Sequence, residues 1–209
     1  SVTIMGNGVF RHCTGLTQVD IPNSVTSIGD NAFQGCRGLT QVTIPSSVTS
    51  IGEEAFRDCT GLTQVAIPGS VTSIGARAFD GCSGLIQVDI PDSVTSVGNN
   101  AFEGCTSLTE VVIPSSVTSI GAGAFSDCTG LVSLHIPGSI TLSALKECFF
   151  VHGDEDEDDF VAPEALDTLP KPGFRLIRQV VSIDLSKKIA ESGNMYAKRF
   201  CALLLLIKI

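Results

Sequence analysis

Apolar positions return along the first two thirds of the chain with a fixed period of 23 residues. An Ile-Pro pair marks one series, at Ile21, Ile44, Ile67, Ile90, Ile113 and Ile136. A Phe-x-x-Cys motif marks a second, independent series in the same register, at Phe10, Phe33, Phe56, Phe79, Phe102 and Phe125. Self-similarity at a single fixed period is the signature of a repeat architecture. We therefore expect a solenoid with one turn, or coil, for each repeat.

Within one repeat, Gln18-Val19-Asp20-Ile21 alternates polar and apolar side chains, which predicts a half-buried strand. Pro22 ends it, because proline has no N–H to donate to a neighbouring strand. The β-branched stretch Val25-Thr26-Ser27-Ile28 predicts a second, shorter extended segment.

The rest of the repeat is read as a turn followed by a short compact piece. Gly29 predicts a turn with positive φ. Ala32, Phe33 and Cys36 lie at spacings of about one helical turn, which predicts a short helical or 3₁₀ piece. About eight apolar positions per repeat point inward, and one repeat alone cannot cover them, so we expect stacked coils to bury them together.

The pattern Leu16-x-x-Val19-x-Ile21, followed by Ile-Pro-x-Ser-Val-Thr-x-Ile-Gly-x-x-Ala-Phe-x-x-Cys, closely resembles the BspA-type leucine-rich repeat family over residues 1–138. The resemblance implies a leucine-rich repeat solenoid with a parallel β-sheet on its concave face and short extended or 3₁₀ segments on its convex side. It also implies protein binding, in adhesion or recognition, by secreted or cell-surface proteins.

The regular repeats do not account for the whole chain. We expect a solenoid over residues 1–148 with about six repeats, the last degenerate because Cys148 follows Cys128 by 20 residues instead of 23. An acidic, Pro-containing linker is expected over residues 149–173, and a partly disordered or helical tail over 174–209. The chain opens inside a repeat and shows no signal peptide, so we expect either a fragment or an array whose ends are covered by other structure.

Charge narrows the classes of partner. The net charge of −9 argues against nucleic acid, which requires clustered Lys and Arg. Residues 160–209 are basic and end in the apolar run Ala202–Ile207, which is too short to span a membrane. A membrane-surface or docking helix is one interpretation of this tail. An unrelated, poorly folded tail is the interpretation we favour.

No motif indicates catalysis. The chain has no Gly-x-Ser-x-Gly, no phosphate-binding loop and no convergent acid, base and nucleophile, so we predict no enzyme and no cofactor. The C-x₂-C spacing of zinc sites is absent, and the acidic run Asp154–Asp159 lacks the spaced ligands of a calcium loop. The six Cys of the repeats are expected to be buried, free thiols.

The predicted function is a non-enzymatic binding scaffold for a protein or a glycan. On a leucine-rich solenoid the outward strand positions form the concave face. They make two candidate columns: Gln18, Gln41, Gln64, Gln87, Glu110 and Ser133, and beside them Asp20, Thr43, Ala66, Asp89, Val112 and His135. Two alternatives stay open: both columns merely tolerate solvent, or the array is a structural spacer within a larger surface or signalling protein.

Overall fold

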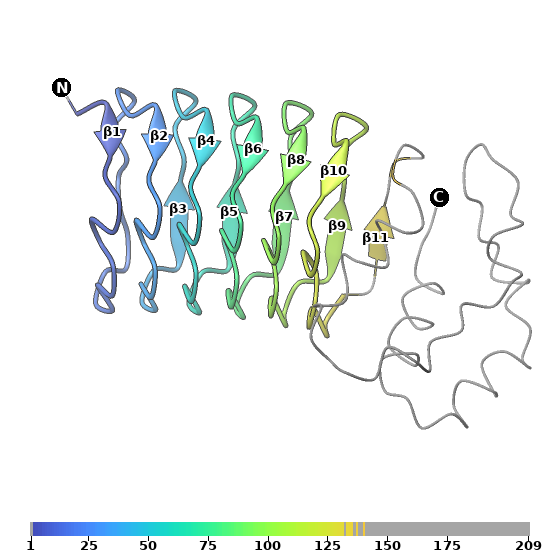
Figure 1. The fold of residues 1–209 in the computed structure, drawn as a ribbon. Helices are drawn as coiled ribbons and strands as arrows, with labels where there is room; N and C mark the ends of the chain where they lie inside the picture. Colours follow the sequence, from blue (N-terminus) through green and yellow to red (C-terminus); the bar gives the residue numbers. More distant parts are fainter. Residues whose placement is uncertain (1, 132, 136, 138–139, 141–209) are drawn as a thin grey trace, which may run out of the picture.

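The computed structural model describes residues 2–131, 133–135, 137 and 140. This part of the chain winds into a solenoid of parallel strands, whose coils lie side by side from β1 (Ile4–Met5) to β11 (Ser133–His135), as Figure 1 shows. The predicted solenoid is therefore confirmed. The predicted linker at 149–173, the tail at 174–209 and the degenerate coil beyond Ile140 lie outside the described residues.

One strand from each of five successive coils belongs to a five-stranded parallel sheet with the order β11-β9-β7-β5-β3. Its other members are β3 (Gln41–Thr43), β5 (Gln64–Ala66), β7 (Gln87–Asp89) and β9 (Glu110–Val112). In these four strands the central residue is buried and its two neighbours are exposed, as the sequence alternation predicts. The strand predicted over residues 18–21 is not formed in the first coil, where Asp20 makes a single isolated bridge to Thr43. We call the outer surface of this sheet the sheet face.

A second parallel sheet runs along the solenoid and consists of two-residue strands, which are the predicted shorter extended segments. Its order is β1-β2-β4-β6-β8-β10, with β2 (Ser27–Ile28), β4 (Ser50–Ile51), β6 (Ser73–Ile74), β8 (Ser96–Val97) and β10 (Ser119–Ile120). The threonine before each strand ties the coils further. The amide of Thr49 donates to the carbonyl of Thr26 at 2.9 Å, and the same pattern repeats along the array.

Residues 29–38 and their equivalents in the other coils, here called the turn segments, are successive turns without a helix in the described chain. The predicted helical or 3₁₀ piece is wrong. The amide of Gln34 donates within its coil to the carbonyl of Asn31 at 3.1 Å, whereas the amide of Phe33 donates to Ala55 of the next coil at 2.7 Å. A helix would use both amides internally, and nothing would then hold the next coil at this edge.

The prediction of a positive φ at Gly29 is also wrong. Positive φ values fall instead at Asn31 (57°) and Gly35 (71°), and at the equivalent positions of other coils. The glycine column that begins at Gly29 serves close packing: a Cβ on Gly75 would lie 2.6 Å from the carbonyl carbon of Gly52. Glycine is required there because two backbones approach each other.

The core lies between the two sheets and the turn segments and repeats in every coil. The six phenylalanine rings form one stack with centroid separations of 5.1–5.5 Å and interplanar angles of 2–13°. Buried Val, Leu, Ile, Ala and Cys side chains surround the stack. Full burial of one large apolar side chain contributes about 1.5–3 kcal/mol before the entropy of ordering is subtracted, so the coils depend on their neighbours for stability.

Candidate functional site

The two predicted columns do form side by side on the sheet face. The parallel register pairs Gln41 with Gln64 and Thr43 with Ala66, and continues in step through the later coils. An isolated bridge between Asp20 and Thr43 extends the alignment to Asp20, the first member of the second column. The exposed members are Gln18, Asp20, Gln41, Thr43, Gln64, Ala66, Gln87, Asp89, Glu110 and Val112. His135 is half-buried, and the side chain of Ser133 lies outside the described part.

Contacts between neighbouring column members are sparse. The Gln87 amide donates to an Asp89 carboxylate oxygen at 3.1 Å within one strand. The His135 Nε2 atom lies 3.5 Å from a Glu110 carboxylate oxygen of the preceding coil. The first contact joins the two columns in the middle strand of the sheet, β7, and the second joins them at its C-terminal end.

A third column, which sequence reasoning missed, borders the sheet face one residue before the strands. Its members are Thr17, Thr40, Thr63, Ile86 and Thr109. The hydroxyl of Thr63 donates to the Thr40 carbonyl at 3.2 Å, and that of Thr109 donates to the Ile86 carbonyl at 3.3 Å. The signal was available, because a leucine-rich strand pattern leaves two successive positions free after its first leucine.

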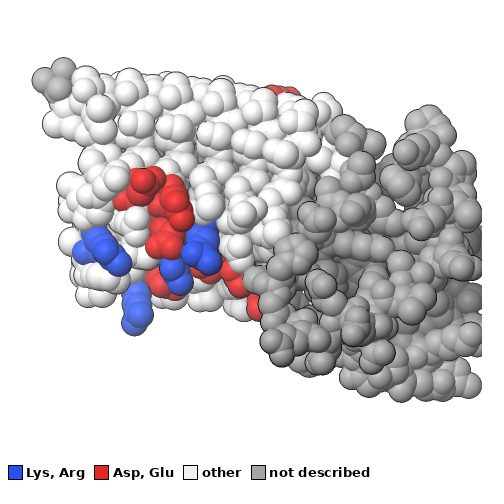
Figure 2. Space-filling view, viewed as in Figure 1, with Lys and Arg blue, Asp and Glu red and all other residues white. Residues whose placement is uncertain are grey.

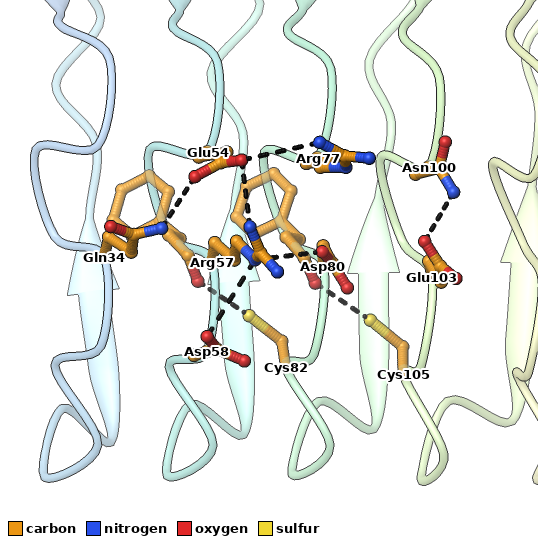
Figure 3. Close-up of polar contacts among 12 residues, drawn as sticks. Gln34, Glu54, Arg57, Asp58, Arg77, Asp80, Cys82, Asn100, Glu103 and Cys105 are labelled. Carbon is orange, nitrogen blue, oxygen red and sulfur yellow. Dashed lines mark hydrogen bonds and ion pairs between the residues drawn. The ribbon is translucent and has the colours of Figure 1, made fainter.

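The turn segments carry a cluster of charged side chains, and Figure 2 shows acidic and basic residues gathered on the side of the molecule in view. Arg57 is at the centre of an ion-pair network: its side chain lies 3.0 Å from Glu54 and 3.1 Å from Asp80 of the next coil. Arg77 lies 3.7 Å from the same Glu54 (Figure 3). Glu54 and Arg77 therefore contribute to contacts between coils.

Burial governs the electrostatics of this network. Loss of solvent raises the pKa of Asp80 to about 6, and the Arg57 cation only partly opposes that shift. At the edge of the network, Gln34 is buried and its amide donates to Glu54 at 2.6 Å (Figure 3). Because these groups already pair with one another, the network binds neighbouring coils together and offers few unsatisfied atoms to a ligand.

Five of the six cysteines in the repeats are buried and unreactive, and the prediction of burial is wrong for Cys13. Cys13 is exposed, whereas the five later cysteines of the repeats are buried, free thiols. The Cys59 thiol donates to the Phe33 carbonyl of the preceding coil at 3.1 Å. Burial raises the pKa of the Cys59 and Cys128 thiols to about 12. Since the thiolate is the reactive form, these groups pack as small apolar side chains that carry a weak donor.

No group of three or more His, Cys, Asp or Glu side chains in the described part of the chain is arranged to hold a metal ion. No helix in it is long and apolar enough to cross a membrane.

A family model described as a BspA-type leucine-rich repeat region matches residues 1–109 and 96–204, with six copies of the repeat. No curated protein matches the chain.

Solved structures with the same fold are leucine-rich repeat proteins. The chain is 37% identical to a leucine-rich repeat protein of T. pallidum, covering 60% of this chain and 61% of that chain with a TM-score of 0.59. It is 30% identical to one from Bacteroides ovatus, covering 66% and 42% with a TM-score of 0.59. It is 38% identical to a leucine-rich cell surface protein from Faecalibacterium prausnitzii, covering 64% and 42% with a TM-score of 0.50. The chain therefore spans less than two thirds of the length of each of these proteins.

Proposed function

The chain belongs to the BspA-type leucine-rich repeat family, and from that premise we propose that it is a non-enzymatic scaffold that binds another protein on its sheet face. The observation that carries the proposal is the contrast within each strand. The buried central residue is Val in β3, β5, β7 and β9, and the exposed residue before it is Gln in the first three strands and Glu in β9. The exposed residue after it changes in charge and size, from Thr to Ala, Asp and Val. Packing explains the constant position, and recognition explains the varied ones.

A role at the cell surface extends this proposal. The similar protein from Faecalibacterium prausnitzii is described as a cell surface protein. Adhesion or recognition outside the cell would use an array in this way, since many weak contacts along a rigid surface add up to stable attachment.

The experiment that tests the proposal uses a displayed library of peptides and small domains, selected against the intact protein. Each selected binder is then measured against Asp89→Asn/Glu110→Gln, which removes two charges from the sheet face. The matched control is Glu53→Gln/Asp92→Asn, which removes two exposed charges elsewhere. We expect binding to fall about tenfold with the first variant and to stay unchanged with the second. A collection of binders indifferent to the sheet-face variant would refute the proposal.

A structural spacer is the second candidate. The hydrogen bonds, the phenylalanine stack and the ion pairs that join successive coils favour it, because they stiffen the array along its length. A spacer has no preferred binding face, so the same selection separates the two candidates.

A further inference from the structure

The sheet face contains two exposed aliphatic side chains that the fold does not require. Five large hydrophobic residues are exposed in the described part: Val2, Ile4, Val9, Ile86 and Val112. The first three lie in the first coil, where no described coil packs on the outer side. Ile86 and Val112 lie in the middle of the array, and about half of each side chain is exposed (51% and 53%).

Ile86 departs from its own column. The other described members are threonines, and those at positions 40, 63 and 109 donate a hydroxyl to the preceding coil. Ile86 keeps the backbone bond to the Thr63 carbonyl at 3.1 Å but has no hydroxyl to donate. Threonine occupies this position in the coils on both sides, so the fold does not require an isoleucine here, and an exposed isoleucine gains nothing from contact with water.

Val112 lies in a more varied column, which includes Ala66, and is the one β-branched aliphatic residue among its described members. Its register partners are Asp89 on one side and His135 on the other, and Thr43 occupies the same column nearer the N-terminus. Val112 and Ile86 belong to adjacent coils and differ by three positions along the strand direction. With ordinary strand spacings their Cα atoms are about 11 Å apart, which lies between the about 7 Å and about 14 Å that separate residue i from i+2 and i+4 on one face of an extended peptide.

The charges around this pair have one sign. Asp89 is the register partner of Val112 in β7, and Glu110 lies in β9 two residues before Val112. The three columns contain no Lys or Arg among their described members, and their carboxylates are Asp20, Asp89 and Glu110. A partner that covers this face meets apolar contacts next to negative charge.

From this arrangement we propose that Ile86 and Val112 form the centre of the binding face, and that the partner is an extended polypeptide segment carrying aliphatic side chains beside Lys or Arg. The inference rests on the proposed binding function and adds the class of partner. Buried aliphatic anchors supply the affinity, and a rim of charges sets orientation and association rate.

The test uses the full chain and two short synthetic peptides, one alternating Leu with Lys and the other alternating Leu with Glu, together with a linear oligosaccharide. Titration calorimetry measures affinity, and methyl NMR shifts locate the site. We expect the Leu–Lys peptide to bind, to shift the Ile86 and Val112 methyl signals, and to weaken as salt increases. We expect the Leu–Glu peptide to bind at least about tenfold more weakly.

The decisive variant is Ile86→Thr/Val112→Thr, which installs residues that the same columns already use and so preserves the fold. It should weaken binding of the Leu–Lys peptide at least about tenfold, while thermal unfolding stays close to that of the original protein. The control Val2→Thr/Val9→Thr removes two equally exposed aliphatic side chains from the first coil and should leave affinity unchanged.

Three results would overturn the inference: no binding of the Leu–Lys peptide, equal affinity in the Ile86→Thr/Val112→Thr variant, or binding of the oligosaccharide alone. Such a result leaves the proposed function standing if library-selected binders still depend on Asp89 and Glu110. If no selected binder depends on the sheet face, both proposals fail together.

Discussion

On the turn segments, the side chains that differ from coil to coil bind one another, whereas on the sheet face they are largely exposed. Arg57 contacts Glu54 and Asp80, and Arg77 reaches the same glutamate. On the sheet face, side-chain contacts include the short-range pairs of Gln87 with Asp89 and of Glu110 with His135. Residues that vary between repeats therefore join neighbouring coils on the turn segments, whereas on the sheet face they remain largely available to a partner.

The backbone sharpens the contrast. Glu54, Asp58 and Arg77 have φ values of 52–57°, a region that costs most L-residues free energy. Other coils use glycine or asparagine at the corresponding positions, for example Gly8, Asn31 and Gly81. On the turn segments, contacts between coils accompany backbone strain. On the sheet face no described column member has a positive φ, so its residues are free to change.

The largest expected effect tests whether both faces depend on the same core. Phe79→Ala leaves a cavity between rings whose centroids lie 5.3 and 5.2 Å from that of Phe79. We expect a loss of about 3–5 kcal/mol in the free energy of unfolding. Amide hydrogen exchange should rise on both faces of the neighbouring coils and less in distant coils, because coils contact only their neighbours. Faster exchange confined to one face would show that the faces are stabilised separately.

An intermediate effect separates the two faces. Arg57→Met removes the central cation and leaves Glu54 and Asp80 without it, so we expect a loss of about 1–2 kcal/mol for this partly exposed network. Glu110→Gln on the sheet face should change stability by less than about 0.5 kcal/mol. Chemical denaturation of both variants gives the comparison. Equal losses would mean that the charges on the two faces have the same structural role.

The pH dependence of stability gives a third test, on the turn segments alone. The pKa of Asp80 is about 6 in the folded chain against 3.8 for the free side chain, so between these values the folded state holds a proton that the unfolded state releases. The stability from this group is therefore present below pH 3.8 and is lost as pH rises towards 6, with a slope of at most about 1.4 kcal/mol per pH unit.

Asp80→Asn removes this titration and leaves every other group in place. Subtracting its unfolding free energy from that of the original protein, pH by pH, should give a difference that falls between pH 3.8 and 6 and is flat above. A difference that rises with pH would mean that Arg57 dominates over burial and lowers the pKa of Asp80.

The sequence predicts the solenoid and the sheet face well, because both follow from local alternation and one fixed period. Val42 between Gln41 and Thr43 is enough to predict which side chains point outward, and identical coil lengths align them in columns. The 23-residue step alone predicts which residues of neighbouring coils lie next to each other. The third column escaped prediction because strict alternation was assumed to begin at Gln18.

The turn segments could not be read in the same way. The spacing of Ala32, Phe33 and Cys36 fits a helix, but the amides of alternate residues must reach the next coil, and that demand is not local. The ion-pair network was partly visible: Glu54 and Arg77 are opposite charges one repeat apart, as are Arg57 and Asp80. What the sequence does not reveal is that the turns also bring Arg57 to 3.0 Å from Glu54, and that this contact joins the two pairs into one network.

The smallest expected effect isolates backbone strain from the contacts of the network. Asp58 has a φ of 57°, and the same column has glycine at Gly35, Gly81 and Gly104. Its ion pair with Arg57 spans 3.9 Å, so little attraction is lost by removing the carboxylate. Asp58→Gly should relieve about 1–2 kcal/mol of strain and cost about 0.5–1 kcal/mol in added chain entropy, for a net gain of at most about 1.5 kcal/mol. Asp58→Asn keeps a side chain that tolerates this region, so its free energy of unfolding should lie between those of the original protein and of Asp58→Gly. If Asp58→Gly destabilises the protein in chemical denaturation, the carboxylate contributes to the network more than its distance from Arg57 implies. The contact with Arg57 would then outweigh the backbone strain at Asp58.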